Sequence, residues 1–88
     1  MLSNPPNDAH VLALNALAAT LADQRLAERF VSLSGFTAPD LKQRAGDPRF
    51  LADFLRFLEA NEPDLIAIAD RIAIKPDRLV IARNLLES

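Results

Sequence analysis

Proline and glycine divide this chain into short segments, and this punctuation constrains its fold more than any other feature of the sequence. Four prolines stand in the first turn of a predicted helix, where the missing amide hydrogen of proline is harmless. These are Pro39, Pro48, Pro63 and Pro76. Gly35 and Gly46 each follow a helical pattern and end it, and Gly35 is expected to do so in the left-handed conformation that glycine readily takes at a helix C-terminus. A chain of 88 residues broken in this way holds about six short helices.

Between these breaks the apolar residues recur at helical spacing rather than in alternation. We therefore predict an all-α fold, a compact bundle of about six short helices in a single domain over residues 8–88, after a flexible lead-in at residues 1–7. Asp8 and Asp23 are the predicted caps of the first two helices, and the first helix is expected to bury Val11, Leu14, Ala18 and Leu21. The predicted core is Leu14, Leu17, Leu21, Leu26, Phe30, Leu33, Phe36, Leu41, Phe50, Phe54, Leu58, Leu65, Ile68, Ile72 and Leu79.

One turn pattern occurs twice. Residues 35–41 read Gly-Phe-Thr-Ala-Pro-Asp-Leu, and residues 73–79 read Ala-Ile-Lys-Pro-Asp-Arg-Leu. Each copy closes one helix and opens the next, so the sequence predicts two similar helix-turn-helix units. In the first copy, Gly35 is expected in the left-handed region, with Phe36 folding back onto the preceding helix as the apolar contact of the cap.

The composition excludes several chemistries. The chain has no cysteine, which rules out disulfides, thiolate nucleophiles and cysteine-bound metal centres. His10, the lone histidine, has no catalytic or metal-binding companions in the sequence and is expected to be an exposed surface residue. With two glycines, the chain has no phosphate-binding loop. We predict that the protein is not an enzyme and binds neither a cofactor nor a metal ion.

Charge and hydropathy indicate which partners and which cellular compartment to expect. The formal net charge is −2, and acidic and basic residues are mixed along the chain, which argues mildly against nucleic-acid binding. No run of apolar residues approaches the length of a membrane span, and residues 1–7 lack the features of a signal peptide. We expect a cytoplasmic protein without a membrane partner.

The second turn has a local resemblance. Residues 68–85 are similar to a bacterial DNA-binding helix-turn-helix, with an apolar-Ala pair, a small turn residue and apolar residues at the following positions. This resemblance implies nucleic-acid contacts through Arg71, Lys75, Arg78 and Arg83. Asp77 at the start of the second helix would repel phosphate, so nucleic-acid binding is the alternative prediction.

A second resemblance covers nearly the whole chain. Its motifs are an Ala- and Leu-rich first helix, Arg29-Phe30, residues 34–37, Pro39-Asp40-Leu41, residues 47–51 and a closing Pro-Asp helix. Together they resemble a family of small bacterial all-helical proteins known only as a domain of unknown function. The resemblance implies a compact helical domain and assigns no functional residue. The second turn of that family usually has glycine where this chain has Ala73.

The last predicted helix, from Pro76 onward, has apolar residues around more of its circumference than one buried face requires. This pattern predicts a protein partner or self-association through that helix, with Val80, Ile81, Arg83 and Asn84 as the contact residues. The function predicted from the sequence is therefore a non-enzymatic interaction module.

Overall fold

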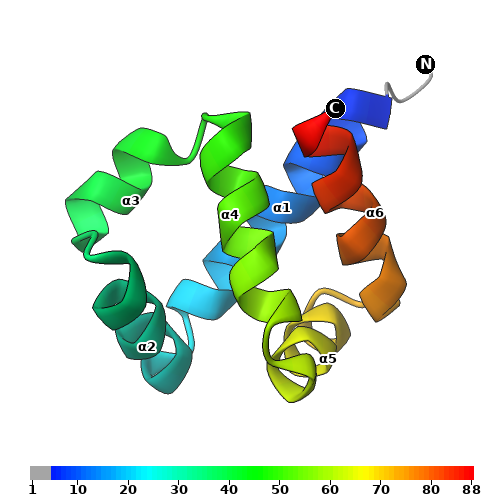
Figure 1. Cartoon of the computed structure of the whole chain (residues 1–88). Helices are drawn as coiled ribbons and strands as arrows, with labels where there is room; N and C mark the ends of the chain where they lie inside the picture. The colour runs from blue at the N-terminus through cyan, green and yellow to red at the C-terminus, as the bar shows by residue number, and fades with distance from the viewer. Residues whose placement is uncertain (1–4) are drawn as a thin grey trace.

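Six α-helices account for most of the chain in the computed structural model, which describes residues 5–88 apart from the side chains of residues 5–8 and 38. They are α1 (Pro5–Leu21), α2 (Gln24–Ser34), α3 (Ala38–Arg44), α4 (Pro48–Glu59), α5 (Glu62–Arg71) and α6 (Pro76–Glu87) (Figure 1). The described residues contain no strand. The prediction of an all-α fold with six helices is confirmed.

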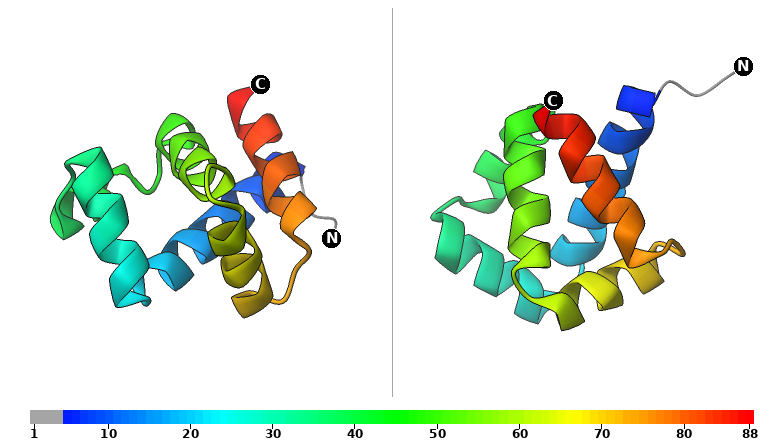
Figure 2. Two further views of the ribbon diagram at one scale, coloured as in Figure 1. Left: turned by 60° about the horizontal axis from the view of Figure 1, so that its bottom comes forward. Right: turned by 45° about the vertical axis from the view of Figure 1, so that its right-hand side comes forward.

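The helices α1 and α4 cross at the centre of the molecule (Figure 1). The helix α6 packs against both of them, and α5 joins α4 to α6 at one end (Figure 2). On the opposite side of α4, α2 and α3 form an arm that leaves the end of α1 and returns to the start of α4 (Figure 1). This arrangement places the two predicted helix-turn-helix units, α2–α3 and α5–α6, on opposite sides of α4.

Local hydrogen bonds explain where three of the helices begin. The N–H of Leu26 donates to Asp23 Oδ1 at 3.1 Å, and the N–H of Arg49 donates to Asp47 Oδ1 at 2.9 Å. Thr37 and Asp40 form a reciprocal capping box: the Asp40 N–H donates to Thr37 Oγ1, and the Thr37 N–H donates to Asp40 Oδ2. The cap predicted at Asp23 and the first-turn positions predicted for Pro39 and Pro48 are confirmed.

The first helix begins earlier than predicted. It starts at Pro5, so residues 5–7 belong to α1 rather than to a lead-in, and Asp8 lies inside the helix instead of capping it. Two consecutive prolines suit this position, because the first turn of a helix needs no amide hydrogens and proline fixes a helical φ. Residues 1–4 of the predicted lead-in lie outside the described residues.

Each of the two turns contains a residue in the left-handed region. Gly35 has φ 77°, as predicted, and Ala73 has φ 61°, so this alanine keeps the left-handed conformation usually taken by glycine. After Ala73 the chain forms a complete Schellman motif, in which the Ile74 N–H donates to the Ala69 carbonyl at 3.0 Å and the Ala73 N–H to the Asp70 carbonyl at 3.1 Å. In both copies the next helix begins three residues after the left-handed residue.

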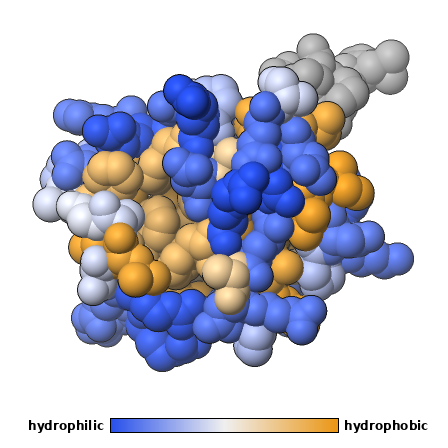
Figure 3. Space-filling view, viewed as in Figure 1, coloured by the Kyte–Doolittle hydropathy of each residue, from blue (hydrophilic) through white to orange (hydrophobic). Residues whose placement is uncertain are grey.

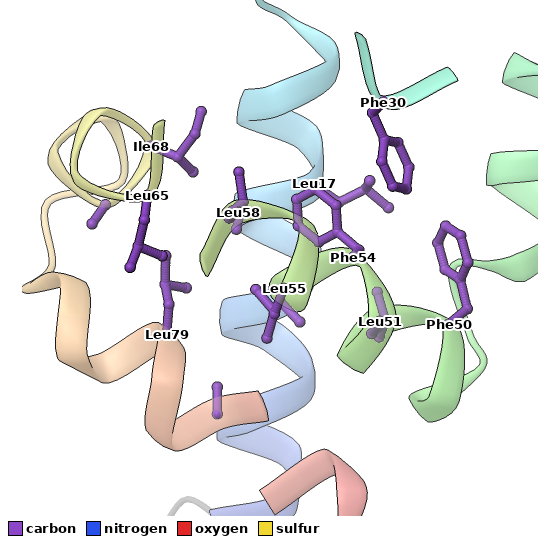
Figure 4. Packing of buried hydrophobic residues seen from close by; sticks show 14 of the residues in the cluster. Leu17, Phe30, Phe50, Leu51, Phe54, Leu55, Leu58, Leu65, Ile68 and Leu79 are labelled. Atoms are coloured by element: carbon purple, nitrogen blue, oxygen red, sulfur yellow. The ribbon is translucent and has the colours of Figure 1, made fainter. Parts of the chain in front are cut away.

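Most of the predicted core is buried. Figure 4 shows Leu65 and Ile68 of α5 with Leu79 of α6 on one side of α4, and Phe30 of α2 on the other. Leu14, Phe36 and Ile72 are half-buried, and they pack against the cluster from its edge. Leu21 and Leu33 were wrongly predicted as core residues: Leu21 is the last residue of α1, and Leu33 near the end of α2 is 72% exposed.

The first helix buries a different face from the predicted one. Its inward residues are Ala9, Ala13, Ala16, Leu17 and Thr20, whereas Val11, Ala18 and Leu21 are exposed. Thr20 satisfies its hydroxyl by donating to the Ala16 carbonyl at 2.8 Å. Small side chains on the inward face let neighbouring helix backbones approach closely, which explains why alanines rather than the larger Val11 and Leu21 face the core.

Candidate functional site

An open cleft of about 910 Å³ lies over α2, α3, α4 and the end of α6. Figure 3 shows its apolar surface between α2, α3 and α4, bordered by hydrophilic side chains. The lining residues that matter for its chemistry are the four rings Phe30, Phe36, Phe50 and Phe57, the rim residue Leu33, and the charged residues Arg44, Asp47, Arg49, Asp53 and Glu87.

Aromatic contacts between the arm and α4 build the floor of this cleft. The Phe30 ring of α2 lies 4.9 Å from the Phe57 ring and 5.4 Å from the Phe54 ring, centroid to centroid, and the Phe54 pair is edge-to-face. Phe36, directly after the left-handed Gly35, meets Phe50 edge-to-face at 5.7 Å. Phe50, Phe54 and Phe57 share one face of α4 because they are spaced by four and three residues. Phe30 and Phe50 are buried, whereas Phe36 and Phe57 are half-buried and available at the surface.

Arg44 and Arg29 each lie over one phenylalanine ring of the aromatic floor. The Arg44 guanidinium lies 4.6 Å from the centroid of the Phe36 ring, and the Arg29 guanidinium lies 5.3 Å from that of Phe57. Arg29 also pairs with Asp64 of α5, but Arg44 and Arg49 form no ion pair among the described residues. The cleft therefore combines an apolar floor with two arginines, Arg44 and Arg49, that form no ion pair among the described residues.

The acidic residues of the cleft differ in whether another residue binds their carboxylate. Asp47 caps α4, and Glu87 of α6 accepts hydrogen bonds from Arg56 Nε at 2.6 Å and from Arg83 Nη1 at 2.9 Å. The bond from Arg56 and then the charges of Arg56 and Arg83 hold the pKa of the Glu87 carboxyl below its ordinary value. Asp53 is exposed and forms no ion pair within the described part of the chain.

The lining offers contacts for binding and two hydroxyls, Ser34 and Ser88. Ser34 Oγ accepts from the Phe36 N–H at 3.2 Å, and the Ser88 hydroxyl donates to the Leu85 carbonyl at 2.7 Å. His10 lies on α1 away from this lining and is half-buried rather than fully exposed as predicted. No group of three or more potential metal ligands occurs among the described residues.

Of the four predicted partner residues on α6, two are exposed and two are packed or paired within the molecule. Ile81 is 50% exposed and Asn84 is exposed, but Val80 is half-buried and packs against the core cluster. Arg83 pairs with both Glu59 and Glu87 and keeps only 14% of its side chain exposed. The structure thus leaves Ile81, Asn84 and the neighbouring Leu85 on the outer face of α6, and it ties Arg83 to α4.

Of the four predicted nucleic-acid contacts, two lie close to carboxylates and two are exposed. Arg71 lies 3.9 Å from Asp23, and Arg83 is held in its two ion pairs. Lys75 and Arg78 are exposed at the start of α6, on either side of the exposed Asp77. Two of the four positive charges are therefore already opposed by carboxylates, and nucleic-acid binding by this unit stays a prediction.

Sequence reasoning missed the cleft, because it assigned Leu33, Phe36 and Phe50 to the core. One signal was present in the sequence: Phe30 and Leu33 lie in the last turns of α2, and a third apolar residue, Phe36, directly follows its C-cap Gly35. A short helix ending in a turn cannot bury all three against the same neighbour.

Comparisons with known proteins show the relationship of the chain but not its activity. None of the described helices is long and apolar enough to cross a membrane. No curated protein and no solved structure matches the chain. One family model matches residues 6–88, nearly the whole sequence, and its description is "Protein of unknown function (DUF3572)". The chain therefore belongs to the DUF3572 family, in agreement with the resemblance found in its sequence motifs.

Proposed function

We propose that this chain is a non-enzymatic protein-interaction module whose cleft between α2, α3 and α4 binds an apolar segment of a partner protein. The observation that carries the proposal is the convergence of Phe30, Phe36, Phe50 and Phe57 on one open cleft with Leu33 at its rim. Aromatic residues and a few polar groups around a concave apolar floor are typical of sites that bind peptides and helices.

The exposure of Leu33 supports this choice of surface. A leucine that is 72% exposed beside two half-buried phenylalanines forms a continuous apolar surface, whereas a single exposed apolar residue would need no explanation. The volume of about 910 Å³ lies in the range of ligand-binding clefts. Covering this surface would remove Leu33, Phe36 and Phe57 from water, which is the main driving force for association.

The outer face of α6 is the weaker candidate for the same function. Its exposed apolar side chains are Ile81 and Leu85, and they lie on a convex helix surface rather than in a recess. Two such residues are a small part of the roughly 800 Å² that each partner contributes to a stable interface. Self-association through α6 is therefore the competing hypothesis, and the experiment compares a variant on α6 with a variant in the cleft.

The test uses an isotope-labelled protein and a synthetic peptide of 18 residues that forms an amphipathic helix with leucine and phenylalanine on one face and glutamine on the other. Amide resonances of the cleft residues are expected to shift on titration, and Leu33→Ser is expected to weaken binding at least about tenfold by removing its contact area. Ile81→Ser is the matched control, since it removes another exposed apolar residue, which is 50% exposed and lies on α6 outside the cleft. Equal weakening by both variants, or no saturable binding at millimolar peptide, would contradict the proposal.

A further inference from the structure

The arginines of the molecule differ in whether a carboxylate neutralises them. Five of the eight arginines, namely Arg25, Arg29, Arg56, Arg71 and Arg83, form ion pairs within the described residues. Of the remaining three, Arg44 and Arg49 line the cleft, and only Arg78 lies elsewhere. The unpaired arginines are therefore concentrated where the apolar floor is open.

The position of Arg44 favours a carboxylate ligand. Its guanidinium is held against the face of the Phe36 ring, with 4.6 Å between the central carbon and the ring centroid. Contact with an aromatic face leaves the N–H groups at the edge of the guanidinium, where they can bind a carboxylate in a bidentate manner. The nearest acidic residue on its own helix, Asp40, forms no ion pair with Arg44. Its hydrogen bonds with Thr37 and then, to a smaller extent, the charge of Arg44 lower the pKa of Asp40.

Arg49 lies five residues further on, in the first turn of α4, so both arginines flank the turn between α3 and α4. None of the carboxylates of the cleft forms an ion pair with them among the described residues. Asp47 caps the first turn of α4, and Glu87 lies between Arg56 and Arg83. Asp53, one helical turn beyond Arg49, is the remaining carboxylate without a partner among the described residues.

From this arrangement we infer that the partner is an amphipathic helix that carries acidic residues beside its apolar anchors, with the carboxylates placed over the α3–α4 turn. The apolar face of such a helix would contact Phe36, Phe57 and Leu33, and its carboxylates would bind Arg44 and Arg49. The inference rests on the proposed function, since it specifies the chemistry of the segment bound in the cleft. Charge complementarity of this kind fixes the orientation of a bound helix as well as adding affinity.

The experiment compares three peptides that share one apolar face and differ only at two flanking positions, which are Glu, Gln or Lys. The Glu peptide is expected to bind about fivefold more tightly than the Gln peptide, because partly exposed ion pairs make modest contributions, and the Lys peptide is expected to bind most weakly. The preference for Glu is expected to shrink as salt is raised. The preference for Glu should disappear in the double variant Arg44→Gln, Arg49→Gln. It should persist in Arg78→Gln, because Arg78 is the third unpaired arginine and lies outside the cleft.

The outcomes separate this inference from the proposed function. Equal binding of the Glu and Gln peptides, with shifts still confined to the cleft, would overturn the acidic partner and leave the interaction function standing. Tighter binding of the Lys peptide would overturn it in favour of recognition by Asp53. Failure of all three peptides to shift the cleft resonances would overturn both.

Discussion

Asp64 at the start of α5 accepts a hydrogen bond from the Arg29 guanidinium of α2, although only 6% of the Asp64 side chain is exposed. Arg25 adds a second positive charge, 3.6 Å from the other carboxylate oxygen. The same Arg29 side chain lies over the Phe57 ring of α4. One ion pair therefore joins the arm to α5 and to the aromatic floor of the cleft.

Replacement of Asp64 by asparagine is expected to lower the free energy of unfolding by about 1–2 kcal/mol, since it removes the charge that Arg29 binds but keeps the size of the side chain. The estimate is at the low end for a buried pair because Arg29 is 33% exposed and partly screened by water. Urea unfolding at neutral pH measures the change. Asp70→Asn, on an exposed aspartate of the same helix without an ion pair among the described residues, should change stability by less than about 0.5 kcal/mol.

Ala73→Gly is expected to stabilise the protein by about 0.5–1 kcal/mol. The left-handed φ of 61° costs an L-residue with a Cβ about 1–2 kcal/mol, and the greater freedom of glycine in the unfolded chain offsets part of this gain. Ala60→Gly is the control, because Ala60 ends α4 in the right-handed region at φ −67° and should lose stability on the same change. A fall in the melting temperature of Ala73→Gly would contradict the assigned backbone conformation.

The two glycines should respond differently to alanine. A Cβ built on Gly35 or on Gly46 meets no atom within 4 Å, so neither substitution causes a clash. Gly35→Ala is nevertheless expected to cost about 1–2 kcal/mol because its φ is 77°, whereas Gly46→Ala is expected to be neutral or slightly stabilising. Chemical denaturation of the two variants side by side checks the difference, and equal effects would argue against a left-handed Gly35.

Phe54→Ala is expected to lower the free energy of unfolding by about 3–5 kcal/mol, since Phe54 is fully buried and packs edge-to-face with Phe30. Calorimetric and denaturant unfolding measure this loss. Leu33→Ala removes a mostly exposed side chain and should be nearly neutral, which also makes Leu33 suitable for binding experiments. An unchanged melting temperature for Phe54→Ala would show that the assignment of the core is wrong.

The bonds from Arg56 and Arg83 to Glu87 predict a dependence of stability on pH. They lower the pKa of Glu87 in the folded protein, so the folded state binds this proton less readily than the unfolded state. The resulting stabilisation is fully present above the ordinary carboxyl value of 4.5 and is lost as the pH falls through the lowered pKa of the folded state. Glu87→Gln should therefore melt at a lower temperature than the parent protein at pH 7, and the two melting temperatures should converge as the medium is acidified below pH 4.5. A difference that stays constant over this range would rule out the ion pairs as its cause.

Several features of the fold follow from short stretches of sequence because their interactions are local. The capping box of Thr37 and Asp40 and the cap of Asp47 over Arg49 join residues two or three positions apart. The left-handed turns at Gly35 and Ala73 are closed by bonds within the same helix end. Helix number, most helix starts and the all-α class were predictable for this reason.

Other features required distant contacts. The α1 sequence has apolar residues on more than one face, and the alanine face became the buried one because α1 packs closely against α6, a segment more than 50 residues away. The buried Asp64 pairs with Arg29, which lies 35 residues away in the sequence, so no local pattern could indicate the pair. A periodic pattern shows which faces can be buried, and packing between helices selects one of them.

The sequence by itself thus determined six short helices, the starts of α2, α3 and α4, and two similar turns, since each depends on the conformational preferences and hydrogen bonds of neighbouring residues. Only the tertiary structure decided that Phe36 and Phe57 stay half-exposed, that Leu33 lies on a rim, and that Arg44 and Arg49 lack carboxylate partners among the described residues. The physical reason is that exposure and ion pairing depend on how the α2–α3 arm is placed against α4, and that placement arises from contacts between residues far apart in the chain.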